Sequence, residues 1–219
     1  MGQTCTELVL ETNVTGRALL QPAADSCKAT VLGFHGYAEN AEIQLSRLEM
    51  LLPDRSWNLI SVQGLYAFYN RTGDVVASWM TKQNREAAIR NNLAFINAVI
   101  ENAKVDNNLG KGVIFAGFSQ GTSMAYRAAA ASRLQCLGVI AVGGDIPPEL
   151  DSSSAGKIGF AVQARGNLDK SYPEEQLTKD IRRLESLRIP HLSVPYAGSH
   201  EWNSELCAAL AEPLKRFLA

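Results

Sequence analysis

The chain has 219 residues, of which 46% are hydrophobic and 20% are charged, and its 21 Lys and Arg nearly balance its 22 Asp and Glu. This near-neutral balance removes the long-range attraction that nucleic acid or an anionic membrane surface requires, so neither is an expected partner. The hydrophobic content is typical of a globular protein with a core and argues against disorder. We therefore expect a soluble globular protein whose partner is a small molecule or a peptide.

The four cysteines are far apart in the sequence, and no histidine lies at a metal-ligand spacing from any of them; they are Cys5, Cys27, Cys136 and Cys207. Such scatter is typical of free thiols in a reducing compartment, so we expect neither disulfides nor a metal. The absence of a signal-peptide pattern and of a long apolar run predicts a cytoplasmic protein with no membrane span. Residues 1–6 fit an N-myristoylation pattern with Cys5 placed for a second acyl chain, which leaves N-terminal lipidation open.

Short apolar runs alternate with segments of helical periodicity from about residue 29 onward, which predicts a mostly parallel sheet with helices on both faces. Before residue 22, the alternation at Leu8, Leu10, Ala18 and Leu20 predicts an antiparallel hairpin at one sheet edge. The predicted strands are 29–34, 57–62, 113–118, 137–142, 158–162 and 192–196. The predicted helices are 84–104, 119–134, 171–187 with Ser171 as its cap, and 203–218, which Pro213 bends or interrupts.

No repeat or convincing linker divides the chain, and residues 151–156 are expected to form only a loop. A single domain over residues 1–219 follows. In sheets of this kind ligands bind at the carboxyl ends of the strands, so the chemistry is expected there.

The strand over 113–118 runs directly into a helix through Gly117-Phe118-Ser119-Gln120-Gly121. This is G-x-S-x-G in the strand–turn–helix context in which the serine is a nucleophile exposed on a tight turn. The alternative is a serine that only caps the helix. We predict that Ser119 is a catalytic nucleophile.

A serine nucleophile needs a base, and the chain has three histidines. Only His200 both follows a predicted strand and comes after Ser119, as the order of residues in this class requires. His191 stands at the start of its strand, far from the serine, and His35 is expected to order its loop by hydrogen bonding. His200 is therefore the predicted base.

Two aspartates lie between Ser119 and His200 and follow strands, and either could orient the histidine: Asp145 and Asp169. The expected oxyanion donors are the backbone N–H of Gln120, the residue after the nucleophile, and that of Tyr37, in the loop after the first core strand. Aromatic residues between 66 and 80, together with Trp202, either line an acyl pocket or pack beneath a loop; they are Tyr66, Phe68, Tyr69 and Trp79.

Several of these motifs together resemble the phospholipase/carboxylesterase branch of the α/β-hydrolases, which includes acyl-protein thioesterases; they are His35-Gly36, the serine motif, Gly166-x-x-Asp169 and Gly198-x-His200. The resemblance runs from about residue 29 to the C-terminus. It implies the triad Ser119, Asp169 and His200, which favours Asp169 over Asp145. It also implies a three-layer α/β-hydrolase fold without a separate cap domain. Tyr37-Ala38-Glu39-Asn40 departs from the family, whose members often have a glycine soon after the His-Gly pair.

These observations predict a serine hydrolase that cleaves carboxylic esters through an acyl-enzyme, without metal or cofactor. An acyl-thioesterase or a lysophospholipase-type activity is the alternative within enzymes, because the same triad serves all acyl transfers. A ligand-binding protein that has kept the fold but does not turn over substrate is the alternative outside enzymes.

Overall fold

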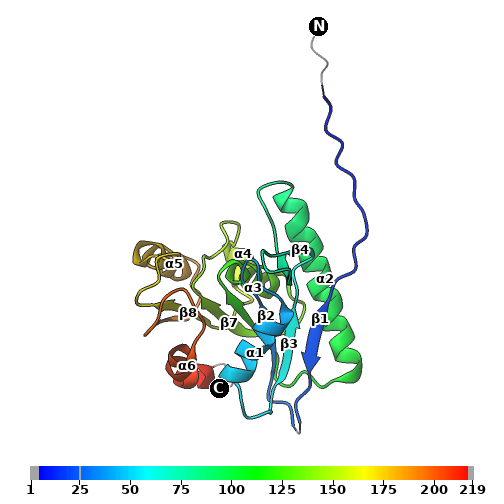
Figure 1. Cartoon of the computed structure of the whole chain (residues 1–219). Helices are drawn as coiled ribbons and strands as arrows, with labels where there is room; N and C mark the ends of the chain where they lie inside the picture. The colour runs from blue at the N-terminus through cyan, green and yellow to red at the C-terminus, as the bar shows by residue number, and fades with distance from the viewer. Residues whose placement is uncertain (1–4, 25, 217–219) are drawn as a thin grey trace.

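A seven-stranded sheet forms the centre of the molecule in the computed structural model, which describes residues 5–24 and 26–216 (Figure 1). The strand order is β1-β3-β2-β6-β7-β8-β9, and only β1 runs antiparallel to its neighbour. The strands are β1 (Ala18–Gln21), β2 (Thr30–Phe34), β3 (Asn58–Val62), β6 (Val113–Phe118), β7 (Cys136–Val142), β8 (Ala161–Gly166) and β9 (His191–Tyr196). Every residue of β2, β3 and β6 is buried, as expected for parallel strands covered on both faces.

Helices cover both faces of the sheet, which confirms the predicted three-layer architecture (Figure 1). On one face lie α1 (Ala41–Leu51) and α6 (Ser204–Arg216). The helix α6 buries Leu206, Leu210 and Leu214, which are spaced four residues apart. On the other face lie α2 (Arg85–Asp106), α3 (Gln120–Ala131), α4 (Ser152–Ala155) and α5 (Glu174–Ser186). Within the described residues, none of the helices is long and apolar enough to cross a membrane.

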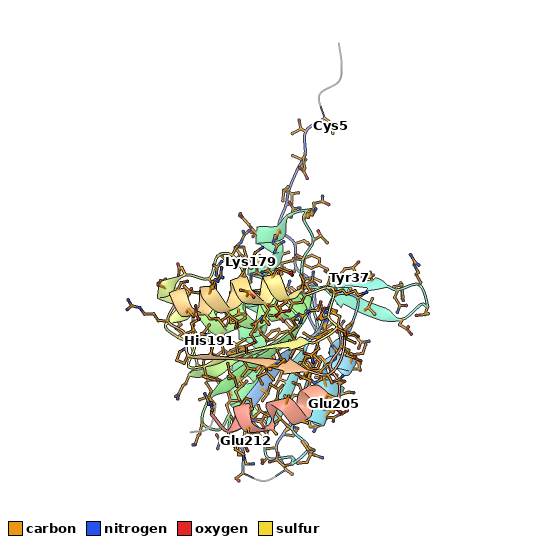
Figure 2. All side chains as sticks on the ribbon, turned by 90° about the vertical axis from the view of Figure 1, so that its left-hand side faces the viewer. Cys5, Tyr37, Lys179, His191, Glu205 and Glu212 are labelled. Carbon is orange, nitrogen blue, oxygen red and sulfur yellow. The ribbon has the colours of Figure 1, made fainter. Side chains whose placement is uncertain are left out.

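A separate two-stranded hairpin, β4 (Tyr66–Tyr69) and β5 (Val75–Ser78), extends from the body of the molecule next to Tyr37 (Figure 2). Its base is joined to the loop after β2 by two backbone hydrogen bonds. Ala77 N–H donates to the Glu39 carbonyl (2.7 Å), and Ala38 N–H donates to the Ala77 carbonyl (3.0 Å). These bonds attach the hairpin to the loop that contains Tyr37, whose N–H is one of the predicted oxyanion donors.

The predicted N-terminal hairpin is wrong. Of the described residues before 22, only 18–21 form a strand, and β1 pairs with β3 rather than with an earlier segment. Leu8 and Leu10 are 80% and 82% exposed, so their alternation does not mark a buried face. The lipidation pattern lies largely in residues 1–4, outside the described residues, and Cys5 is exposed.

Two helices were not predicted. The buried positions of α1 include Ala41 and Gln44 besides leucines, so its hydrophobic period is weak. Residues 151–156 contain α4 instead of only a loop, because the Asp151 side chain accepts hydrogen bonds from the N–H groups of Ser153 and Ser154 as a helix cap.

Other elements begin or end at residues that differ from the prediction. The helix expected from Ser171 begins at Glu174 and has Pro173 at its cap position, and the Ser171 N–H donates to Asp169 (2.8 Å). The strand predicted over 158–162 is β8, which begins three residues later and ends four residues later. The last helix is not interrupted by Pro213, since α6 continues to Arg216.

Candidate active site

Ser119 stands between β6 and α3 in a conformation that few residues other than glycine adopt, with φ 51° and ψ −118°. Its side chain makes no capping bond to α3, unlike a serine that only begins a helix. The flanking glycines are required by close backbone contacts: a Cβ at Gly117 would lie 2.4 Å from the Gly121 carbonyl oxygen, and one at Gly121 would lie 2.1 Å from that of Phe34. The local fold therefore presents the Ser119 hydroxyl at the carboxyl edge of the sheet.

The structure brings Ser119, His200 and Asp169 together in one chain of hydrogen bonds. His200 Nε2 lies 2.9 Å from Ser119 Oγ, and His200 Nδ1 lies 2.8 Å from Asp169 Oδ2. A carboxylate only accepts hydrogen bonds, so Nδ1 carries the proton and Nε2 is free to accept the serine hydroxyl proton. This tautomer is the one that a general base needs.

The Asp169 side chain is fully buried, and both of its oxygens are engaged. Oδ2 bonds His200, while Oδ1 accepts the N–H groups of Ser171 and Tyr172, each at 2.8 Å. These bonds fix the carboxylate before α5 begins. The partner of His200 Nδ1 is therefore Asp169. Asp145, the alternative acid, follows β7, and its backbone carbonyl accepts a hydrogen bond from Ser123 Oγ (3.3 Å).

The loop after β2, which contains Tyr37, begins beside the start of α3: a Cβ at Gly121 would lie 2.6 Å from the His35 carbonyl oxygen. Around Tyr37, Gly36 N–H donates to Glu39 Oε2 (2.7 Å) and Ala38 N–H donates to Ala77 (3.0 Å). Tyr37 N–H has no acceptor among the described residues. Gln120 is the first residue of α3, where backbone N–H groups have no acceptor within the helix. Both amides are thus available to bind an oxyanion.

His35 is completely buried and connects this loop to Gly64, two residues after the end of β3. Its Nδ1 bonds the Gly36 carbonyl (2.7 Å), and its Nε2 accepts the Gly64 N–H (3.0 Å). Burial lowers the pKa of His35, which keeps the ring neutral. The expectation that His35 orders the loop is confirmed. His191 lies at the opposite end of the sheet from Tyr37 (Figure 2).

Gln120 and Trp79 support the loop through their side chains. Packing beneath a loop was one of the two expectations for Trp79, whereas the sequence pattern did not indicate a role for the Gln120 side chain. Gln120 Oε1 accepts the Trp79 N–H (3.1 Å), and its Nε2 donates to the Met80 carbonyl (3.0 Å). Trp79 is fully buried, and its indole N–H donates to the His35 carbonyl (2.8 Å). Trp79 therefore packs under the loop and does not line an open pocket.

The other aromatic residues divide into three groups. Tyr66 and Phe68 share one face of β4, and the Phe68 ring lies 5.7 Å from the Tyr37 ring. Tyr69 points to the opposite face and is 76% exposed. Trp202 is buried in the core between the sheet and α6. Of these four aromatic residues, Phe68 has a ring contact with Tyr37 in the candidate oxyanion loop.

Tyr66 also borders a cavity of about 640 Å³ between the N-terminal segment and the start of α2. No group of three or more His, Cys, Asp or Glu side chains in residues 5–24 and 26–216 is arranged to hold a metal ion. The four cysteines are free thiols.

Comparisons with known proteins agree with this architecture. The profile of the Phospholipase/Carboxylesterase family matches residues 16–215. A search of curated proteins gave no match. Similar solved structures include esterase PE8 (19% identity, covering 93% of this chain and 100% of that one, TM-score 0.73) and the Bacillus cereus carboxylesterase (16% identity, 93% and 96%, TM-score 0.72). Another is the Zea mays acyl-protein thioesterase 2 (15% identity, 94% and 100%, TM-score 0.70).

At these identities the solved structures establish a shared fold. The profile match extends over nearly the whole chain, from before β1 to the last turn of α6. The protein belongs to the phospholipase/carboxylesterase family of α/β-hydrolases.

Proposed function

We propose that the protein is a serine esterase that cleaves carboxylic esters through an acyl-enzyme intermediate. The observation that carries the proposal is the hydrogen-bonded chain from Ser119 Oγ through His200 to Asp169. Nucleophile, base and orienting acid are each within hydrogen-bond reach of the next, as acyl transfer by a serine requires.

In the first half-reaction, Ser119 Oγ attacks the ester carbonyl carbon while its proton passes to His200 Nε2. The carbonyl oxygen becomes an oxyanion that accepts the N–H groups of Tyr37 and Gln120, beside the positive end of the α3 dipole. Asp169 stabilises the imidazolium. The tetrahedral intermediate then collapses, and His200 gives the proton to the departing alcohol oxygen.

In the second half-reaction, a water molecule replaces the alcohol. Its proton passes to His200 Nε2 as its oxygen attacks the acyl carbon, and the same two N–H groups hold the second oxyanion. Collapse breaks the bond to Ser119 Oγ, which recovers its proton from His200. The products are a carboxylic acid and the free enzyme.

The decisive experiment combines turnover of p-nitrophenyl esters with covalent labelling by a fluorophosphonate, in the wild type and in Ser119→Ala. We expect the substitution to abolish labelling and to lower kcat by about 10⁴-fold or more. Ser123→Ala, on the next turn of the same helix, is the matched control and should keep both. Labelling and turnover that survive in Ser119→Ala would refute the proposal.

The substrate panel should include acyl thioesters and lysophospholipids beside esters of increasing acyl length. The family and the similarity to an acyl-protein thioesterase make these the relevant alternatives. A kcat/KM for thioesters far above that for oxygen esters with matched acyl groups would replace the ester assignment. Reversible ligand binding without turnover would favour the non-catalytic alternative.

A further inference from the structure

An ion pair between Glu39 and Arg47 lies under the candidate site. Glu39 is in the loop after β2, and Arg47 is in the second turn of α1. The two terminal guanidinium nitrogens of Arg47 donate to the Glu39 carboxylate, Nη1 to Oε2 at 2.5 Å and Nη2 to Oε1 at 2.7 Å. Only 13% of the Arg47 side chain and 19% of the Glu39 side chain are exposed. A two-point contact of this kind holds both side chains in one orientation.

The Glu39 carboxylate also holds the candidate oxyanion loop. Oε2, which already bonds Arg47, accepts the Gly36 N–H at 2.7 Å. A Cβ at Gly36 would lie 2.9 Å from that oxygen, so the glycine permits the close approach. The carboxylate thereby closes the turn that contains Tyr37, and its bond satisfies the neighbouring amide without using the Tyr37 N–H.

Arg47 also reaches the base through Phe118, the residue before Ser119. The guanidinium carbon lies 4.2 Å from the centre of the Phe118 ring, and the Phe118 ring lies 5.0 Å from the His200 ring. A guanidinium over an aromatic face is a favourable cation–π arrangement. Phe118 is only 4% exposed, so a change on the Arg47 side is transmitted to the imidazole by packing.

We propose that Glu39 and Arg47 form a positioning pair for the hydrolysis, holding the oxyanion loop through Gly36 and the ring of His200 through Phe118. The inference rests on the proposed function and extends it to two residues outside the hydrogen-bonded chain of Ser119, His200 and Asp169. The two charges also act on the site in opposite directions. Burial is the largest cause of the lowered pKa of His35. The charge of Glu39 raises that pKa, and the charge of Arg47 lowers it.

Other charged and titratable groups around His200 stay unchanged in the test below. Asp169 binds Nδ1, and Glu201, the next residue, accepts the Ser199 N–H. Arg165 donates to the Asp169 carbonyl, and Tyr196 donates its hydroxyl hydrogen to the Glu201 carbonyl. A difference between variants of the pair therefore reports on the pair.

The experiment measures kcat and KM for a p-nitrophenyl ester against pH in the wild type, Glu39→Gln, Arg47→Met, Arg47→Lys and the double variant Glu39→Gln/Arg47→Met. Loss of positioning should lower kcat by about 10- to 100-fold in Arg47→Met with little change in KM. Arg47→Lys keeps the charge but not the planar contact, so it should recover only part of kcat. The exposed pair Arg17–Glu42, which also involves α1, supplies the matched controls Arg17→Met and Glu42→Gln.

The pH profile separates positioning from a purely structural role. Arg47→Met leaves an unpaired anion that favours the protonated imidazole, so the acid limb of kcat/KM should move to higher pH. Glu39→Gln leaves an unpaired cation and should move it to lower pH. The guanidinium lies within about 9 Å of the imidazole through Phe118, so shifts on the order of half a pH unit are expected. The double variant should return close to the wild-type limb.

Shifts in opposite directions with a loss of kcat support the inference. Shifts in the same direction, or changes no larger than those of the Arg17 and Glu42 controls, overturn it while leaving the proposed function intact. Fluorophosphonate labelling counts the folded active sites in each variant, so a loss due to unfolding is recognised and removed. A wild type without turnover overturns the proposed function and this inference together.

Discussion

Asp169 and His200 lie in loops that follow two adjacent parallel strands, β8 and β9, and their Oδ2 and Nδ1 atoms are 2.8 Å apart. The preceding strand, β7, is followed directly by Gly143, where a Cβ would lie 3.2 Å from both side chains. Gly143 has φ 61°, which suits a glycine. Three consecutive strand ends thus enclose the contact between the acid and the histidine.

Replacing Asp169 by Asn should lower kcat by about 10⁴-fold, because an amide in place of the carboxylate favours the wrong tautomer of His200. The measurement is turnover of a p-nitrophenyl ester at saturating substrate. Asp145→Asn is the matched control and should change kcat by less than about threefold, since Asp145 is not the partner of Nδ1. A larger loss in Asp145→Asn than in Asp169→Asn would reverse the assignment of the acid.

Ala38→Gly should stabilise the protein by about 1 kcal/mol, because Ala38 has φ 59°, a region that disfavours any residue with a Cβ. The measurement is the free energy of unfolding in urea. Ala94→Gly, at an exposed position inside α2, should instead destabilise by about 1 kcal/mol. Destabilisation by both substitutions would show that the loop does not keep this backbone conformation in solution.

The stability of the protein should fall on acidification in part because of His35. Burial lowers its folded-state pKa below the ordinary 6.5, so its contribution is fully present above pH 6.5 and is lost as pH falls through the folded-state pKa. His35→Gln has no proton to take up there. The free energy of unfolding of the wild type relative to His35→Gln should therefore decrease below pH 6.5. Parallel pH profiles of the two proteins would contradict this.

Phe68→Ala should raise KM for bulky or aromatic esters by about five- to tenfold while leaving that for the acetate ester nearly unchanged, because the Phe68 and Tyr37 rings offer apolar surface beside the oxyanion loop. Tyr69→Ala is the control, since Tyr69 points to the other face of β4. Equal effects of the two substitutions would remove the Tyr37–Phe68 surface from the substrate pocket.

The central sheet was predictable because β2, β3 and β6 are buried on both faces and therefore read as continuous apolar runs. The helix α1 was not, since Gln44 occupies one of its buried positions. The alternation at Leu8 and Leu10 led to the prediction of a hairpin that does not form there, because alternation marks a strand only where one face of it is covered.

At the candidate site, Ser119 and His200 could be placed from the sequence because both follow strands that end at the same edge. The choice of Asp169 over Asp145 required the family resemblance. The contacts of Glu39, Arg47 and the Gln120 side chain could not be inferred, because they join segments that are remote in sequence or lie in a loop without a repeating pattern.

The attachment of the β4–β5 hairpin also determines where the chain can accept extra residues. Its base shares backbone hydrogen bonds with Ala38 and Glu39, whereas residues 70–74 at its tip bond mainly among themselves. A longer segment grafted at the tip would leave in place the hydrogen bonds that join the base of the hairpin to Ala38 and Glu39. The same insertion within β5 would shift its register against Glu39, so the tip is the place at which the chain can be lengthened without disturbing the loop that carries Tyr37.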